Sequence, residues 1–305
     1  MVNNSKILVA GGTGFIGSSL IKELISKGNQ VVSISINSKG IKNKVKNAIY
    51  ISHDLNKPIN TNKFLDDFDY LVNCSGYVNH IDYLKGGKEI FNTHFESCYN
   101  LANLAMELNI KTFINIGSSD EYGDNKSPLN ESIREKPISP YALGKLTATH
   151  YLQRCFRQGY LNTVVIRPFL VFGESQNQNR FLPYLINNCI NDREFKVSKG
   201  EQIRDYLYIK DFTRALINTM GNEKAYGEVI NIASGIPISI KEVINYVQEI
   251  IGTGKPLYGS IDYRRGENME LYANIEKAKK ILNWEPIFDF KNSVKNVINW
   301  YLKNV

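Results

Sequence analysis

The chain has 305 residues, 43% of them hydrophobic and 22% charged, and a formal net charge of +7. Its length suits one large α/β domain or two smaller ones, and no apolar run approaches the about 18 residues of a membrane span. The basic charge lacks the dense run with interleaved aromatic residues that is typical of nucleic-acid binding. The four cysteines and four histidines lack zinc and redox spacings, and no leader sequence precedes the first apolar run. We therefore expect a cytoplasmic protein without a metal site.

Short apolar runs alternate with helical patterns through the first 168 residues. The expected strands are 6–12, 30–36, 48–55, 70–76, 112–118 and 162–168, and the expected helices are 15–28, 89–109 and 140–159. Strands separated by helices form right-handed βαβ units. The pattern predicts an α/β fold with a Rossmann-type, doubly wound parallel sheet.

The regular alternation of expected strands and helices ends after Pro168. A helix is expected at 181–191, a hairpin at 194–209, a helix at 210–220, a strand at 228–234, and helices at 239–252, 274–283 and 290–304. We predict that residues 1–175, together with about 205–235, form the first domain. Residues of about 176–204 and 236–305 then form a smaller, discontinuous carboxyl-terminal lobe.

The stretch "VAGGTGFIG", residues 9–17, follows the first expected strand and opens the first helix. Its glycines fit GxxGxxG through Gly11, Gly14 and Gly17, with Phe15 and Ile16 between the last two. Glycines permit a tight turn and let the backbone approach a pyrophosphate, which the helix amino terminus attracts. The position between a strand and a helix predicts that these residues bind a dinucleotide.

The end of the second strand bears on which dinucleotide is bound. NAD-binding sites usually have an acidic residue there, which holds the ribose 2′-hydroxyl. Here Ser35 occupies that position, and Asn37, Ser38 and Lys39 follow. Because no carboxylate would repel a 2′-phosphate, we predict NADP in preference to NAD. Asp54, with Leu55 beside it in "HDL", is a candidate near the adenine, the alternative being an ordinary loop aspartate.

Two further stretches carry candidate catalytic groups. "SPYALGK", residues 139–145, places Tyr141 and Lys145 on one face of an expected helix, where an ammonium lowers the pKa of a phenol and suits it to acid–base work. "GSSDEYG", residues 117–123, follows an expected strand. It thus brings hydroxyls and carboxylates to the sheet edge where ligands bind.

These motifs occur in order with "VIRPFLVFG", "IRDYLYIKD" and "YRRGENMELYANIEKAKKILNWEP". Together they resemble the extended, nucleotide-sugar-modifying branch of the short-chain dehydrogenase/reductase family. The resemblance implies a Rossmann domain that holds NAD(P), a lobe that holds a nucleoside-diphosphate sugar, and a triad of Ser118, Tyr141 and Lys145. It implies that Ser118 hydrogen-bonds the reacting sugar oxygen, Tyr141 exchanges its proton, and Lys145 binds the nicotinamide ribose.

The resemblance also implies residues that bind the substrate. Arg204 and Arg264 match positions that clamp the diphosphate, a task suited to the planar guanidinium, although an ion pair with Asp205 or Glu267 is the alternative. The other implied positions are Asn92 near the cofactor, Ser119 near the substrate, and Arg180 and Phe181 near the nucleotide base. Leu170 stands where relatives often have a substrate-contacting asparagine, so the base stays open.

Three reactions share this scaffold: 4-epimerisation, 4,6-dehydration and 4-keto reduction. A dehydratase needs carboxylates in positions that hold Ser119 and Asp120 here, with Glu121 next to the motif tyrosine. Adjacent side chains of an extended chain point to opposite sides. Asp120 is thus expected to face the sugar as a catalytic candidate, and Glu121 to point away, which disfavours dehydration.

"GSSDEYG" is similar to the "GSSEEYG" of reductases that act on 4-keto-6-deoxy sugar nucleotides. The prediction is therefore an NAD(P)H-dependent 4-keto reductase of deoxysugar biosynthesis for surface polysaccharide. A 4-epimerase and a 4,6-dehydratase are the alternatives. The intact triad disfavours a non-catalytic dinucleotide sensor. The resemblance implies that the helix at 140–159 pairs with the helix at 89–109 in a homodimer. Apolar residues on the helix at 140–159 exceed one core-facing stripe, which fits this pairing, the alternative being burial within the monomer.

Overall fold

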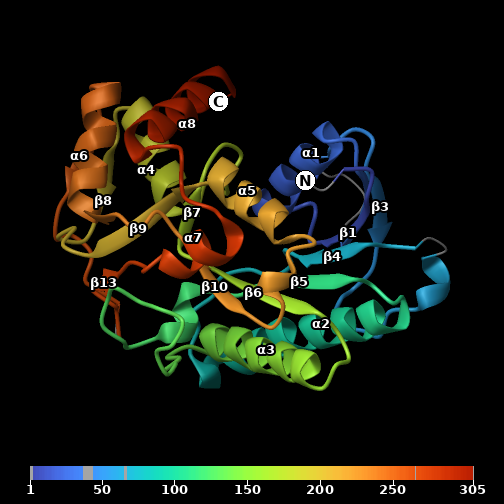
Figure 1. Ribbon diagram of the computed structural model, residues 1–305. Coiled ribbons are helices and arrows are strands. Elements are labelled where there is room, and N and C mark those ends of the chain that lie inside the picture. Colours follow the sequence, from blue (N-terminus) through green and yellow to red (C-terminus); the bar gives the residue numbers. More distant parts are fainter. Residues whose placement is uncertain (1–2, 37–43, 65–66, 265, 305) are drawn as a thin grey trace.

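A computed structural model describes residues 3–36, 44–64, 67–264 and 266–304 (Figure 1). These residues form a seven-stranded sheet in the order β10-β6-β5-β4-β1-β2-β3, in which every neighbouring pair is parallel. The strands are β1 (Lys6–Ala10), β2 (Gln30–Ser35), β3 (Ile49–Ser52), β4 (Tyr70–Asn73), β5 (Thr112–Ile116), β6 (Thr163–Pro168) and β10 (Val229–Ile232). The predicted α/β fold with a parallel, Rossmann-type sheet is confirmed.

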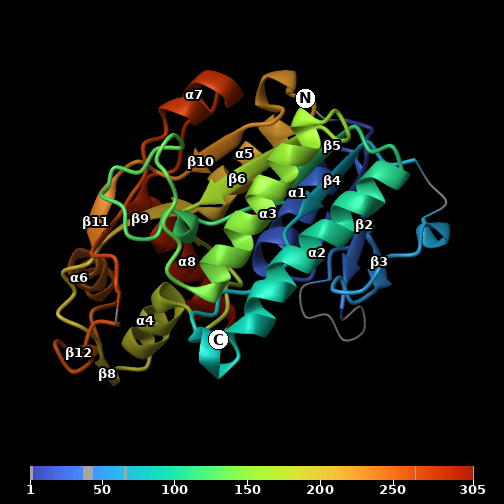
Figure 2. The same ribbon diagram turned by 90° about the horizontal axis from the view of Figure 1, so that it is seen from below.

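Helices cover both faces of this sheet (Figures 1 and 2). They include α1 (Phe15–Ser26), α2 (Gly87–Glu107), α3 (Pro140–Arg157) and α5 (Ile209–Thr219). Strand β1 shows why two layers form, because its side chains alternate between two cores. Ile7 and Val9 belong to the core that includes α1 and α5. Leu8 and Ala10 belong to the core beneath α2 and α3.

The remaining strands form smaller sheets. Strand β9 (Ile203–Tyr208) pairs with β7 (Leu170–Phe172), β11 (Pro237–Ser239) and β13 (Glu270–Leu271), whereas β8 (Glu194–Lys196) pairs with β12 (Lys255–Leu257). The hairpin expected at 194–209 is therefore wrong, because its two strands join different sheets.

Helices α4, α6 and α8 pack beside these sheets, and α7 packs near β10 (Figure 1). They span α4 (Phe181–Ile190), α6 (Ile240–Ile251), α7 (Glu276–Leu282) and α8 (Phe290–Asn304), and single turns form η1 (Thr61–Lys63), η2 (Tyr83–Lys85), η3 (Ser119–Tyr122) and η4 (Glu223–Ala225). Within the described residues, no helix has the length and hydropathy of a membrane span. The division into a first domain and a discontinuous lobe stays a prediction.

Strands β1, β4 and β5 are neighbours in the sheet, so their carboxyl ends lie side by side. The glycine turn follows β1, Cys74–Gly76 follows β4, and Gly117 and Ser118 follow β5. Ligands of open parallel sheets bind at this edge. The fold thus brings the two motifs that the sequence singled out to one edge.

Candidate active site

The glycine turn after β1 is shaped by close approaches of backbone to backbone. Gly11 has a φ of +75°, and a Cβ there would lie 2.8 Å from backbone atoms of Cys74 and Ser75. A Cβ on Gly17 would lie 2.3 Å from the carbonyl oxygen of Gly11. Gly14 caps α1 in an extended conformation, and the side chains of Phe15 and Ile16 pack against the core. The turn therefore presents bare backbone and the amino terminus of α1.

The residues expected near the adenosine lie at the ends of β2 and β3. The buried Ser35 hydroxyl has no hydrogen-bond partner among the described residues. Asn37, Ser38 and Lys39 lie outside the described residues, so the structure does not place them. Asp54 accepts a hydrogen bond from the Asn56 amide at 3.1 Å. Leu55 lies in the core beneath α2 and α3.

The three triad residues come together from two adjacent segments. Tyr141 and Lys145 lie one turn apart on α3, which begins at Pro140 and is capped by the Ser139 hydroxyl. Both side chains are buried, and the Lys145 ammonium donates to the Ile116 carbonyl at the end of β5, at 2.7 Å. Ser118, two residues beyond Ile116, is also buried and hydrogen-bonds with Tyr141. The structure thus places a hydroxyl, a phenol and an ammonium together.

The pKa of Tyr141 reflects the burial of the phenol. Burial raises it, and the negative charge of Asp120 adds to the increase, whereas the hydrogen bond with Ser118 opposes it. Burial also lowers the pKa of Lys145. In the chain itself the loss of hydration sets the direction of the Tyr141 shift. The expected depression of the Tyr141 pKa by Lys145 stays a prediction.

The turn after β5 is also not the extended segment that we expected. Residues 119–122 form the single turn η3, with Ser118 as its cap. Glu121 is fully buried and pairs with Arg167 of β6. Its carboxylate meets Arg167 and Thr149 in the interior, and a turn, not strand alternation, takes it there. Ser119 is buried within the same turn.

Asp120 stays partly exposed and meets a residue that the sequence did not single out. Its carboxylate lies 2.7 Å from Nε2 of His80, whose Nδ1 is 3.4 Å from the Arg264 guanidinium. The His80 ring lies edge-on to Tyr141, with centroids 5.8 Å apart. His80 thus links a catalytic candidate to a substrate-binding candidate. No spacing motif marks it, because its partners are 40 and 184 residues away.

His94 of α2 is a second residue that sequence reasoning missed. Its ring lies 4.8 Å from that of Tyr141, centroid to centroid, and its Nε2 is 2.9 Å from the Tyr77 carbonyl. Burial, followed by the charge of Lys145, lowers the pKa of His94 to about 3. The ring is therefore neutral at ordinary pH, and it donates from Nε2 while packing against the catalytic phenol.

The remaining candidates lie around the same edge. Arg204 of β9 pairs with Glu267, which was one of the two expected alternatives, whereas Asp205 is buried among the amides of Ser234, Gly235 and Ala273. The positive charge of Arg180, at the start of α4, reaches both Tyr141 and Tyr206. Phe181 is the first residue of α4, and Asn92 is half-buried on α2.

Comparison with known proteins places this site in a family. The model of the NAD dependent epimerase/dehydratase family matches residues 7–233, which include both turns and the triad. The chain belongs to the NAD dependent epimerase/dehydratase family. This membership confirms the resemblance to the extended short-chain dehydrogenase/reductase branch.

Individual members of the NAD dependent epimerase/dehydratase family match nearly the whole chain. The "Uncharacterized UDP-glucose epimerase YtcB" of Bacillus subtilis is 27% identical, over 96% of both chains. The "dTDP-glucose 4,6-dehydratase 1" of Escherichia coli is 25% identical, over 98% of this chain and 93% of its own. A solved UDP-N-acetylglucosamine 4-epimerase from Methanobrevibacter ruminantium, in complex with UDP-N-acetylmuramic acid, is 27% identical with a TM-score of 0.89, over 100% of both chains. These names denote epimerisation or dehydration, not 4-keto reduction.

The residues present fit the dinucleotide that the name of this family implies. Bare backbone at Gly11, Gly14 and Gly17 leaves room for a pyrophosphate at the start of α1, because side chains there would collide with backbone or occupy the approach. The Ser35 hydroxyl, which has no partner among the described residues, is buried at the end of β2, where ribose contacts are usual. The Lys145 ammonium reaches the end of β5, two strands away from the strand that precedes the glycine turn.

Proposed function

We propose that the protein is an NAD-dependent 4-epimerase of UDP-sugars, in place of the 4-keto reductase predicted above. The observation that carries the proposal is the different fate of the two carboxylates in one turn. Glu121 is locked in a buried pair with Arg167, while Ser118, Tyr141 and Lys145 converge. A dehydration needs an acid and a base besides the triad, whereas epimerisation needs only the triad and a hydride carrier. The epimerase names of similar proteins favour the same reaction.

The chain's own residues would handle the proton at the 4-hydroxyl. When bound, NAD supplies reversible hydride transfer at its nicotinamide ring. Tyr141 Oη would take the hydroxyl proton as C4 is oxidised and return it as C4 is reduced. The Ser118 oxygen accepts the Asp120 amide at 3.1 Å, and its O–H, which meets Tyr141 in the chain itself, would hydrogen-bond the sugar oxygen. Lys145 supplies the positive charge that favours the phenolate.

Binding of the sugar nucleotide is proposed for the arginines at the other side of the site. Arg204 and Arg264 carry the charge and planar geometry that suit a diphosphate. Each has an internal partner, Glu267 for Arg204 and His80 for Arg264. A diphosphate would replace these partners. Arg180 and Phe181, with Ser119 and Asn92, stay predicted contacts.

NAD is proposed as the cofactor because the family is NAD dependent. The NADP preference rested on Ser35 and on residues 37–39, of which the structure describes Ser35. It therefore stays a prediction. Isothermal titration calorimetry with NAD and with NADP compares the affinities for the two cofactors directly.

The reaction is tested by incubating the protein and NAD with single UDP-hexoses, UDP-N-acetylhexosamines and UDP-hexuronates. We expect the 4-epimer to form, as seen by proton NMR, without net change in NADH absorbance. Oxidation of NADPH or NADH by a 4-keto-6-deoxy sugar nucleotide, with no epimer from any UDP-sugar, would establish the reductase instead. Release of a 4-keto-6-deoxy product would establish the dehydratase.

A homodimer through α2 and α3 is part of the proposal. These helices lie side by side across one face (Figure 2), and contacting rings of Phe95, Tyr99 and Tyr151 line them. Tyr99 and Leu143 expose 42% and 43% of their surface. We expect light scattering to give twice the mass of one chain for the wild type, and the mass of a single chain for Tyr99→Lys. The cytoplasmic location stays a prediction.

A further inference from the structure

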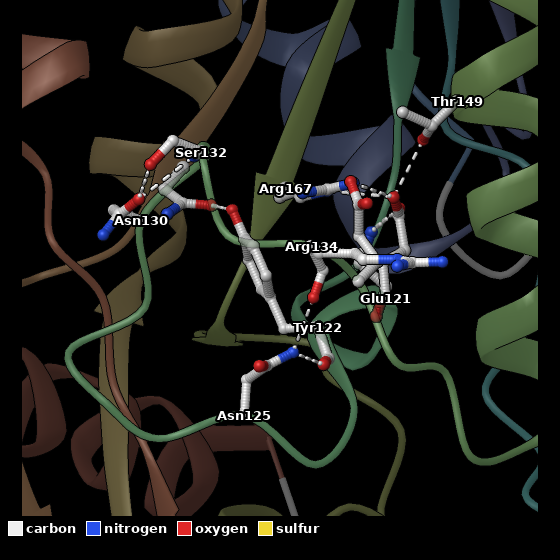
Figure 3. Close-up of polar contacts among 11 residues, drawn as sticks. Glu121, Tyr122, Asn125, Asn130, Ser132, Arg134, Thr149 and Arg167 are labelled. Atoms are coloured by element: carbon white, nitrogen blue, oxygen red, sulfur yellow. Dashed lines mark hydrogen bonds and ion pairs between the residues drawn. The ribbon is translucent and has the colours of Figure 1, made fainter.

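The side chain of Glu121 is held on all sides by buried donors. Its Oε1 accepts the Ser118 amide at 2.8 Å, and its Oε2 accepts the Thr149 hydroxyl at 2.9 Å. Arg167 reaches Oε2 with Nε at 2.9 Å and with Nη2 at 2.8 Å. Figure 3 shows Arg167 and Thr149 converging on this carboxylate from separate elements. A carboxylate with four such contacts has one position available to it.

The space for the carboxylate is provided by a missing side chain. A Cβ on Gly117 would lie 2.4 Å from Oε1 of Glu121. The glycine before Ser118 is thus required here for packing, and not for its backbone conformation. Thr149 lies one turn beyond Lys145 on α3, so the helix that carries the catalytic pair also holds this carboxylate.

The buried charges around Glu121 compensate one another. Arg167 also pairs with Glu135, at 2.8 Å. Lys145 is the other buried cation, and the Glu121 charge is the strongest influence that opposes the lowering of its pKa by burial. Two carboxylates therefore face two cations. Burial of the Glu121–Arg167 ion pair costs free energy, because both charges lose their hydration.

The contacts of Ser118 indicate a role for the buried Glu121 carboxylate. Its amide donates to Glu121, while its hydroxyl oxygen accepts the Asp120 amide, so both ends of the residue are fixed by the cap of η3. We propose that Glu121 is a positioning residue, which holds the Ser118 backbone so that its hydroxyl meets Tyr141 and the substrate oxygen. Arg167 and Thr149 act through Glu121 in this arrangement. The proposal rests on the proposed function, because it concerns the same triad.

Positioning predicts an effect on the rate and not on binding. A displacement of about 1 Å in a reacting group can cost about 100-fold in rate. Within the part of the chain that the structure describes, the hydrogen bonds of the Glu121 carboxylate go to Ser118, Thr149 and Arg167, and none goes to the glycine turn or to the arginines that would bind the diphosphate. Variants of Glu121 should therefore lower kcat and leave the KM for the sugar nucleotide within about twofold.

Three variants distinguish a positioning role of Glu121 from a general contribution of the buried ion pairs to stability. Glu121→Gln keeps an oxygen that can accept the Ser118 amide but loses the charge, and Glu121→Leu loses both. Glu135→Gln is the matched control, because it removes a charge from Arg167 without touching Ser118. We expect kcat to fall about tenfold in Glu121→Gln, about 100-fold in Glu121→Leu, and less than about twofold in Glu135→Gln. All three should lower the melting temperature, because each weakens a buried ion pair.

A second measurement does not depend on turnover. The Ser118 amide, observed by NMR with selective serine labelling, should exchange slowly with solvent in the wild type and in Glu135→Gln. It should exchange faster and shift in Glu121→Leu. If the wild type epimerises no UDP-sugar, the proposed function fails while this amide still tests the contact.

Two results would overturn the positioning role. One is a fall of kcat in Glu135→Gln that equals the fall in Glu121→Gln, since activity would then follow the ion pair as a whole. The other is a Ser118 amide that is unchanged in Glu121→Leu. If Glu121→Leu does not fold, the comparison of Glu121→Gln with Glu135→Gln still decides.

Discussion

Two turns at the same edge of the sheet are built in opposite ways. The turn after β1 is shaped by side chains that are missing, because a Cβ on Gly17 would lie 2.3 Å from the Gly11 carbonyl oxygen. The turn after β5 is filled by charge, because Glu121 and its partner Arg167 are both fully buried. The first turn offers bare backbone to a ligand, and the second offers placed side chains.

This difference suggests a division of labour between binding and chemistry. Backbone amides at a helix start suit a phosphate, which needs charge and close approach but no proton transfer. A hydroxyl and a phenol that move a proton must be held in position, and buried hydrogen bonds do this. Damage to the first turn should therefore weaken dinucleotide binding, and damage to the second should slow the reaction.

The largest expected effect is the loss of the Tyr141 hydroxyl. Tyr141→Phe should lower turnover about 1,000-fold, because it removes the group that exchanges the proton. NAD affinity, measured by calorimetry, should stay within about twofold. Tyr122→Phe is the control, since Tyr122 is also buried but its hydroxyl donates to Asn231. Loss of NAD binding in Tyr141→Phe would contradict the division of labour.

Gly11→Ala probes the first turn, and Gly159→Ala is its match. The two glycines have φ values of +75° and +72°, but a Cβ on Gly159 has no neighbour within 4 Å among the described residues. Gly159→Ala should cost about 1 kcal/mol of unfolding free energy for backbone strain. Gly11→Ala should cost about 2 kcal/mol more for the collision, and should weaken NAD binding. Equal losses in urea denaturation would show that the close approach is relaxed.

The same contrast explains what the sequence could predict. The glycine turn was predicted because its constraints are local and only glycine satisfies them. The positions of Tyr141 and Lys145 followed from helical spacing. Glu121 was placed by strand alternation, which failed because its partners, Thr149 and Arg167, lie 28 and 46 residues away. His80 was missed for the same reason, since nothing near it in the sequence indicates that Asp120 and Arg264 will meet it.

His94, which packs on Tyr141, makes the stability of the folded protein depend on pH. Burial lowers the pKa of His94 to about 3, while the unfolded chain titrates near about 6.5. Below that pH the unfolded state binds a proton that the folded state rejects, so stability falls as the pH falls. Between pH 7 and 5 the wild type should lose about 2 kcal/mol more than His94→Gln, measured by urea denaturation. Parallel pH profiles would show that the folded protein admits the proton.

The smallest expected effect distinguishes between two roles of Asp120. After burial, the Asp120 charge is the strongest influence that raises the pKa of Tyr141; Glu121 adds to it, and Ser118 and Arg180 oppose it. Removal of the charge in Asp120→Asn should therefore lower that pKa. The phenolate needed for oxidation at C4 would then form at lower pH, and the rising limb of the kcat profile should move to lower pH.

Asp124→Asn removes the same charge from an exposed position in the chain segment that follows, and it should leave the profile in place. If Asp120→Asn instead abolishes turnover at every pH without moving the limb, Asp120 itself exchanges a proton. A dehydratase requires a second proton-exchanging group, whereas an epimerase does not. A kcat profile that moves to lower pH in Asp120→Asn therefore supports epimerisation, and loss of turnover at every pH supports dehydration.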